Sequence, residues 1–105
     1  MYFGNKLKSL RLERQETLHK VAVGTNIDMT LLSKFERRER MPTNEQAEKI
    51  ARYFGIDLMR LTVELTAEKI LNEYGMNAIT YEAAHLVKEA FVEYNTDRDN
   101  EDEKK

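Results

Sequence analysis

The sequence predicts an all-α protein, and three observations support this class. Apolar residues recur every three or four positions along most of the 105-residue chain, which is the period of an amphipathic helix. No segment alternates apolar and polar residues between turn signals, as a β-hairpin would. Residues that favour the ends of helices, such as Thr17, Asp28 and Gly55, separate the apolar segments.

Composition restricts the class further. The length suits one domain with a modest core, and the absence of cysteine excludes disulfides and thiolate metal sites. The first fifteen residues are charged throughout and lack the apolar stretch of a signal peptide. No apolar run approaches the length of a membrane span. We therefore expect a cytoplasmic protein without a membrane partner.

Charge is distributed unevenly along the chain. Residues 1–65 carry 12 basic and 9 acidic side chains, whereas residues 66–105 carry 5 and 10, which together give the net charge of -2. A basic first part would attract phosphate groups, and an acidic second part suggests a different role.

Three helices are expected before Pro42. The first places Leu7 on its inner side. The second follows Thr17, a suitable N-cap, and ends near Asn26, which tolerates the left-handed conformation of a tight turn. The third runs from the N-cap Asp28 to about residue 38. Its outer face carries the residues at positions i, i+3, i+4 and i+7, which are Thr30, Ser33, Lys34 and Arg37.

Further helices follow. Thr43 opens a fourth helix with a capping box, Gly55 ends it, and Asp57 caps a fifth. The fifth helix either breaks near Thr66 or continues to Tyr74, and the sequence leaves both alternatives open.

Residues 66–94 form a C-terminal helical extension in this interpretation, with a sixth helix from about Ala78 to Tyr94. Its apolar stripe could close the core of one subunit or pack against the same stripe of a second copy. We expect a dimerisation element, with the interface residues Tyr81, Leu86, Val87, Phe91 and Tyr94. Residues 95–105 contain eight charged side chains in eleven, which predicts a disordered acidic tail.

Two short helices, a tight turn at Asn26 and the helix after it make a helix-turn-helix arrangement. Short polar side chains near the start of such a helix can reach base edges of DNA, and cations further along can reach phosphates. The mixed charges between Lys34 and Arg40 would alone fit a solvated helix face equally well. In the context of the turn, they favour a DNA-binding surface.

The segment LHKVAVGTNIDMTLLSKFERRERMPTNEQAEKIARYFGID resembles the Cro/repressor-type (XRE-like) helix-turn-helix family of bacterial and phage regulators. The matching residues include Ala22, Ser33, Glu36 and Pro42, together with the AEKIARYFGID segment. The resemblance covers about residues 3–65. It implies a five-helix, lambda-repressor-like domain over residues 1–65 that binds the major groove of double-stranded DNA, usually as a dimer.

The resemblance also assigns roles to individual residues. The residues at the base-reading positions of the family are Met29, Thr30, Ser33 and Lys34. The residues at or near its backbone-contacting positions are Thr17, His19, Lys20, Arg37, Arg38 and Arg40. Glu36 matches a family glutamate that is mainly structural.

The sequence departs from the family pattern at several positions. Leu18 stands where the family often has a phosphate-contacting glutamine, so a neighbouring polar residue would have to replace that anchor. Asn26 and Arg38 stand where the family usually has glycine. A left-handed arginine costs roughly 1 kcal/mol, so either that cost is accepted or the helix continues. Met29 could contact a thymine methyl group but cannot hydrogen-bond to a base.

No pattern of catalytic or metal-binding residues is visible. His19 and His85 are far apart and lack the HExxH spacing, and no glycine-rich phosphate loop occurs. We expect no enzyme, no cofactor and no metal site.

We therefore expect a sequence-specific DNA-binding transcriptional regulator, in the form of a homodimeric repressor. The alternative is an antitoxin or other protein-interaction module whose C-terminal helices bind a partner protein. A restriction–modification controller is also compatible with the sequence.

Overall fold

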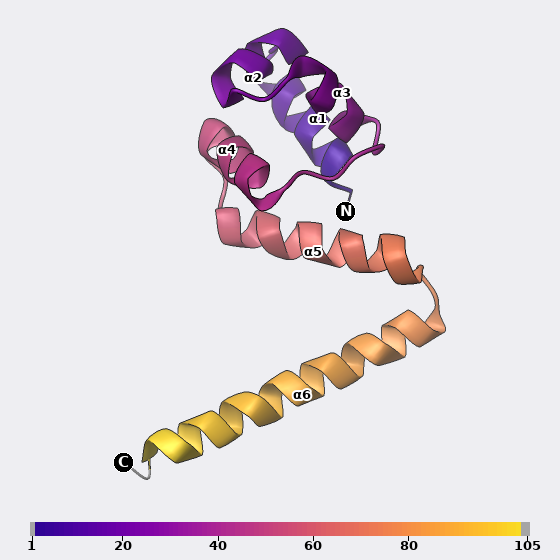
Figure 1. The fold of residues 1–105 in the computed structure, drawn as a ribbon, viewed down its shortest axis with the longest axis vertical. Helices are drawn as coiled ribbons and strands as arrows, with labels where there is room; N and C mark the ends of the chain where they lie inside the picture. Colours follow the sequence, from indigo (N-terminus) through magenta and orange to yellow (C-terminus); the bar gives the residue numbers. More distant parts are fainter. Residues whose placement is uncertain (1, 104–105) are drawn as a thin grey trace. The chain divides into compact units, whose positions relative to one another are not determined.

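The structure, a computed structural model, describes residues 2–103, with side-chain surroundings for residues 2–98. Within this range it contains six helices and no strand, so the all-α prediction is confirmed. The helices are α1 (Phe3–Glu13), α2 (Leu18–Thr25), α3 (Met29–Glu36), α4 (Asn44–Phe54), α5 (Leu58–Tyr74) and α6 (Ala78–Glu103) (Figure 1). No helix in the described range is both long and apolar enough to cross a membrane.

The predicted N-caps form as expected. The Thr17 hydroxyl accepts a hydrogen bond from Lys20 N at 3.1 Å, and the Asp28 carboxylate accepts one from Thr30 N at 2.8 Å. Thr43 begins α4 with a complete capping box. Each cap satisfies backbone N–H groups that have no partner inside the helix, which fixes where the helix starts.

The core lies among α1 to α5. It consists of apolar side chains that each helix contributes at helical spacing: Phe3, Leu7, Val21, Ile27, Leu32, Phe35, Ala47, Ile50, Ala51, Phe54, Leu61 and Leu65. Figure 1 shows α1, α2 and α3 gathered together, with α4 following. Within the core, the rings of Phe3 and Phe35 pack edge to face with their centroids 6.0 Å apart, which ties α1 to the end of α3.

Helix α5 is continuous from Leu58 to Tyr74, which answers the question that the sequence left open. Its middle part contacts the start of α1. The Phe3 N–H donates a hydrogen bond of 2.6 Å to the buried carboxylate of Glu68, and Lys6 Nζ lies 2.8 Å from Glu64 Oε2. The hydrogen bond from Lys6 lowers the pKa of Glu64. These contacts explain why Glu68 belongs to the first compact unit although it lies beyond residue 65.

The chain divides into two compact units, Met1–Ile70 and Leu71–Lys105, which we call the N-terminal unit and the C-terminal unit. The C-terminal unit consists mainly of α6, whose described side chains are exposed except for the half-buried Thr80 and Asn95. The sequence placed the end of this helix at Tyr94 and a disordered tail at residues 95–105. In the structure α6 instead continues to Glu103, and residues 104–105 lie outside the described part. Once a helix is nucleated, each added residue forms one more backbone hydrogen bond, so a charged segment can extend it.

Candidate nucleic-acid interface

Helices α2 and α3 form the predicted helix-turn-helix. Asn26 ends α2 in the left-handed conformation, with φ 56° and ψ 40°, and its N–H donates to the Ala22 carbonyl. Asp28 caps α3 two residues later. Between them, the buried side chain of Ile27 anchors the turn in the core. Local backbone geometry and one apolar anchor thus fix how α3 leaves the turn.

Helix α3 has one side in the core and one side free. Leu32 and Phe35 are fully buried. The four predicted base-reading residues lie elsewhere on the helix: Met29 and Thr30 are exposed, and Ser33 and Lys34 are half-buried. Residues i, i+3 and i+4 lie on the same face of a helix. Thr30, Ser33 and Lys34 therefore share one edge, as the sequence predicted, and we call this edge with Met29 the reading edge.

The end of α3 differs from the prediction by about two residues. The helix ends at Glu36, and Arg37 is its C-cap. Arg38 then adopts a left-handed conformation with φ 62°, and Glu39 N donates to the Lys34 carbonyl at 2.9 Å. This pattern is a Schellman motif, which is usually closed by glycine. Of the two alternatives that the sequence left open, the structure therefore has the strained, left-handed Arg38 and not the longer helix.

Arg38 has a contact that glycine could not make. Its guanidinium carbon lies 4.2 Å from the centroid of the Tyr2 ring, which is cation–π geometry. Such a contact contributes about 0.5–1 kcal/mol at an exposed site, similar in size to the strain. Both Arg38 and Arg40 are exposed, but the stacking directs the Arg38 guanidinium toward the start of α1, so it is less available for a phosphate.

The other predicted backbone-contacting residues are all exposed. Arg37 lies 3.2 Å from Glu39, which partly neutralises it. At the start of α2, Thr17 already uses its hydroxyl as the N-cap, whereas His19 and Lys20 project into solvent. Leu18 packs against the core, so it supplies apolar contact in place of the glutamine that the family often has.

A nearly buried ion pair links α1 to α3. Arg11 Nε donates to one oxygen of Glu36 at 2.8 Å, and Arg11 Nη2 donates to the other at 2.9 Å. Both side chains are less than 15% exposed. The hydrogen bond to Glu36 raises the pKa of Arg11. The structural role predicted for Glu36 therefore has a physical basis, although its partner was not predicted, since no local pattern joins residues 25 positions apart.

A second polar contact joins α4 to the segment that precedes α2. Tyr53 donates a hydrogen bond from its hydroxyl to Glu16, and the carboxylate raises the pKa of Tyr53. The ring of Tyr53 lies directly against Gly24 of α2, where any Cβ would clash with it. Arg14 stacks on the ring at 5.3 Å. The sequence gave no signal for this contact, which sets the close approach of α2 to α4.

The residues predicted for a dimer interface all lie on α6 and are exposed, with Phe91 at 62%. Tyr81 differs from the others in position. It precedes Val87 by six residues, which places it on another side of a helix with 3.6 residues per turn. Its ring packs edge to face against His85, with the centroids 4.7 Å apart.

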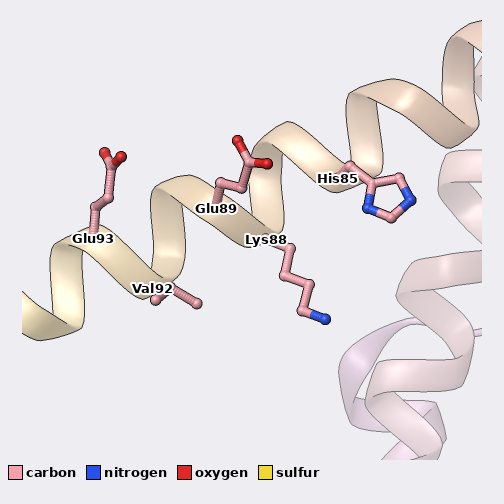
Figure 2. Close-up of a pocket in the computed structure, with 5 residues that line it drawn as sticks. All are labelled: His85, Lys88, Glu89, Val92 and Glu93. Atoms are coloured by element: carbon pink, nitrogen blue, oxygen red, sulfur yellow. The ribbon is translucent and has the colours of Figure 1, made fainter.

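A shallow hollow on α6 carries no ligand site. Figure 2 shows the five side chains around it, which are His85, Lys88, Glu89, Val92 and Glu93. All belong to the same helix, and they project in different directions instead of converging on one point.

The tight turn, the capped recognition helix and the basic residues after it together define a helix-turn-helix DNA-binding domain. Residues 7–61, more than half of the chain, match the family model described as helix-turn-helix. The chain belongs to this Cro/repressor-type (XRE-like) family, as the sequence resemblance predicted. No curated protein matches the chain, and no solved structure matches it. A domain of this family implies DNA binding and is typical of regulators that are not enzymes.

Proposed function

We propose that the protein is a sequence-specific transcriptional regulator, a homodimeric repressor that places α3 in the major groove of DNA. The observation that carries this proposal is the reading edge of Met29, Thr30, Ser33 and Lys34. It is exposed or half-exposed on a helix whose other side is fixed by Leu32 and Phe35 and whose end is fixed by the Arg11–Glu36 pair.

A fixed helix with a free edge suits base recognition because specificity requires side chains held in one orientation. Each residue of the edge has a chemistry that fits the major groove. The Lys34 ammonium can donate to guanine O6 and N7, and the hydroxyls of Thr30 and Ser33 can donate or accept. Met29 can only make an apolar contact, and the thymine methyl group is the apolar feature of this groove.

Exposed basic residues beside α3 and α2 support the same placement, because they could contact the DNA backbone. Arg40 follows the recognition helix and, among the described residues, lies beyond ion-pair distance of any carboxylate. Arg37 is held by Glu39 but is more than half exposed, so a phosphate could compete for it. Lys20 and His19 are exposed at the start of α2, where unpaired backbone N–H groups also favour an anion.

Dimerisation is supported by the exposed apolar residues of α6. In a symmetric dimer the two recognition helices would enter successive major grooves about 34 Å apart. Occupancy of an operator by such a dimer is sufficient for repression when the operator overlaps a promoter.

Selection of bound duplexes from a random pool, at one stated salt concentration, tests the proposal. A dimer of this kind should enrich a palindromic site with half-site centres about 10 base pairs apart. An enriched pool without a shared sequence would contradict sequence-specific recognition. A shared but non-palindromic site would contradict the symmetric dimer.

The salt dependence of affinity tests the backbone contacts separately. Arg37→Ala should weaken binding to every duplex and reduce the slope of log affinity against log salt by about one unit. Arg52→Ala on α4 is the matched control, because Arg52 is also exposed and also ion-paired, with Glu48 at 2.8 Å. Equal slopes for the two variants would mean that Arg37 contacts no phosphate.

One observation favours a second candidate function, that of a module whose α6 binds a partner protein, as an antitoxin would. Ile79, Leu86, Val87, Phe91 and Val92 are all more than half exposed on one helix. A chain that stays monomeric and binds DNA only together with a partner would favour this function over the homodimeric repressor.

A further inference from the structure

The side chain of Arg38 contacts the start of α1 at two points. Its guanidinium carbon lies 4.2 Å from the centroid of the Tyr2 ring. Nearer to the backbone, its Cγ lies 3.0 Å from the position that a Cβ of Gly4 would occupy. Residue 4 must be glycine in this arrangement, because a Cβ there would also clash with the Phe35 carbonyl oxygen. The start of α1 therefore holds both the stem and the head of this arginine.

The backbone of Tyr2 is itself fixed on both sides. Tyr2 is the N-cap residue of α1, and its carbonyl accepts a hydrogen bond of 3.1 Å from Lys6 N. The next N–H group, that of Phe3, donates to the buried carboxylate of Glu68 at 2.6 Å. The Phe3 ring also packs against Phe35. The half-buried Tyr2 therefore offers Arg38 a partner whose position is set by the fold.

The three arginines that follow α3 are in different situations. Arg37 is paired with Glu39 at 3.2 Å, Arg38 is stacked on Tyr2, and Arg40 is exposed. Stacking on a neutral ring leaves the charge of Arg38 intact but determines where that charge lies. Contacts with phosphates carry no sequence information, so every additional one strengthens binding to all duplexes.

We propose that Tyr2 limits the sequence-independent part of DNA binding by keeping the Arg38 guanidinium on α1 and away from the phosphate backbone. A phosphate could recruit this guanidinium only at the cost of its contacts with Tyr2 and Gly4. The inference rests on the DNA binding of the proposed function. It adds Tyr2 as a positioning residue, and it gives Arg38 a role different from the backbone contact that the family resemblance implies.

A limit on sequence-independent binding is useful to a regulator. Sites of unrelated sequence far outnumber any operator, and they compete for the same protein. Each cation withheld from the phosphates weakens this competition, while the bases remain accessible to the reading edge. Tyr2 would therefore leave more of the protein free to occupy its operator.

The salt dependence of binding to a duplex of random sequence tests this role of Tyr2. The full chain is used without any extension at its N-terminus. Tyr2→Ala should tighten binding roughly threefold to tenfold at about 0.1 M salt and should steepen the slope of log affinity against log salt by about one unit, as one additional phosphate contact would. A merely structural role of Tyr2 predicts the opposite sign, because a damaged fold binds more weakly.

Two further variants assign the effect to the stacked pair. Tyr2→Phe keeps the aromatic ring and should bind like the unaltered chain. In an Arg38→Ala background, Tyr2→Ala should change neither affinity nor slope, since no guanidinium is then released. Circular dichroism checks that each variant is folded. Binding by Tyr2→Ala that equals or falls below that of the unaltered chain would overturn the proposal, and so would a gain that persists without Arg38.

The outcomes also separate this inference from the proposed function. If Tyr2→Ala leaves the slope unchanged while the unaltered chain still selects a palindromic site, the inference is wrong and the proposed function stands. If selection enriches no shared sequence but Tyr2→Ala still steepens the slope through Arg38, the inference stands and sequence-specific regulation fails. If the unaltered chain binds no duplex at all, both are wrong.

Discussion

The N-terminal unit and the C-terminal unit use apolar side chains in opposite ways. In residues 1–70, apolar residues from five helices are buried in one core, and Phe35 is 1% exposed. In residues 71–105, α6 keeps its apolar residues on the surface, and Phe91 is 62% exposed. The first pattern stabilises a fold within one chain, whereas the second can stabilise the protein only by contact with another surface.

This difference shows where each function can reside. Base reading requires a helix held rigidly, and the N-terminal unit holds α3 by its core and by the Arg11–Glu36 pair. Association requires apolar surface that folding has not used, and α6 provides it. Substitutions of the same type in the two regions should therefore have different consequences.

The largest contrast is expected between two phenylalanines. Phe35→Ala should lower the free energy of unfolding by about 3–5 kcal/mol, because it removes buried apolar contacts and leaves a cavity. Phe91→Ala should change the unfolding of the isolated monomer by less than about 0.5 kcal/mol, since Phe91 is exposed. Urea unfolding at low protein concentration, followed by circular dichroism, measures both. Similar losses would mean that α6 belongs to the folded core.

A smaller contrast is expected between two glutamates that each pair with an arginine. Glu36→Ala removes the two carboxylate oxygens that accept hydrogen bonds from the nearly buried Arg11 and should cost about 2 kcal/mol. Glu48→Ala breaks the exposed pair with Arg52 and should cost less than about 0.5 kcal/mol. Thermal unfolding of the two variants gives the difference. If Glu36→Ala is as stable as Glu48→Ala, the recognition helix does not depend on this ion pair.

The smallest contrast concerns two residues in left-handed conformation, Gln15 with φ 56° and Arg38 with φ 62°. Gln15→Gly should raise the free energy of unfolding by about 1 kcal/mol, because glycine removes the steric cost of this conformation. Arg38→Gly should gain less, since it also loses about 0.5–1 kcal/mol of stacking on Tyr2. Equal gains in melting temperature would show that the Tyr2 contact contributes nothing.

Local features of the fold could be predicted from the sequence because they depend on neighbouring residues. The caps at Thr17, Asp28 and Thr43 need only a side chain and the backbone two or three positions later, and all three form. The left-handed Asn26 likewise follows from its own conformational freedom. The apolar period likewise placed Leu7 on the buried side of its helix.

Contacts between distant residues could not be predicted in this way. Glu68 holds the N–H of Phe3 across 65 positions, and no local pattern indicates that a glutamate on α5 will be buried there. The same holds for Arg11 and Glu36. The sequence also could not decide whether Arg38 would be strained, because that depends on Tyr2 lying beside it in three dimensions. The base contacts of the reading edge stay predictions.

The central claim is that the reading edge of α3 recognises DNA sequence, and one measurement tests it most directly. The affinity of the full chain is compared for its selected duplex and for a scrambled duplex at one fixed salt concentration. We predict that the Ser33→Ala and Lys34→Ala double variant loses this preference by roughly tenfold or more, since a good base contact contributes about 1–3 kcal/mol of discrimination. Lys49→Ala, at a half-buried lysine on α4, should keep the preference. An unchanged ratio of affinities in the double variant would contradict the claim.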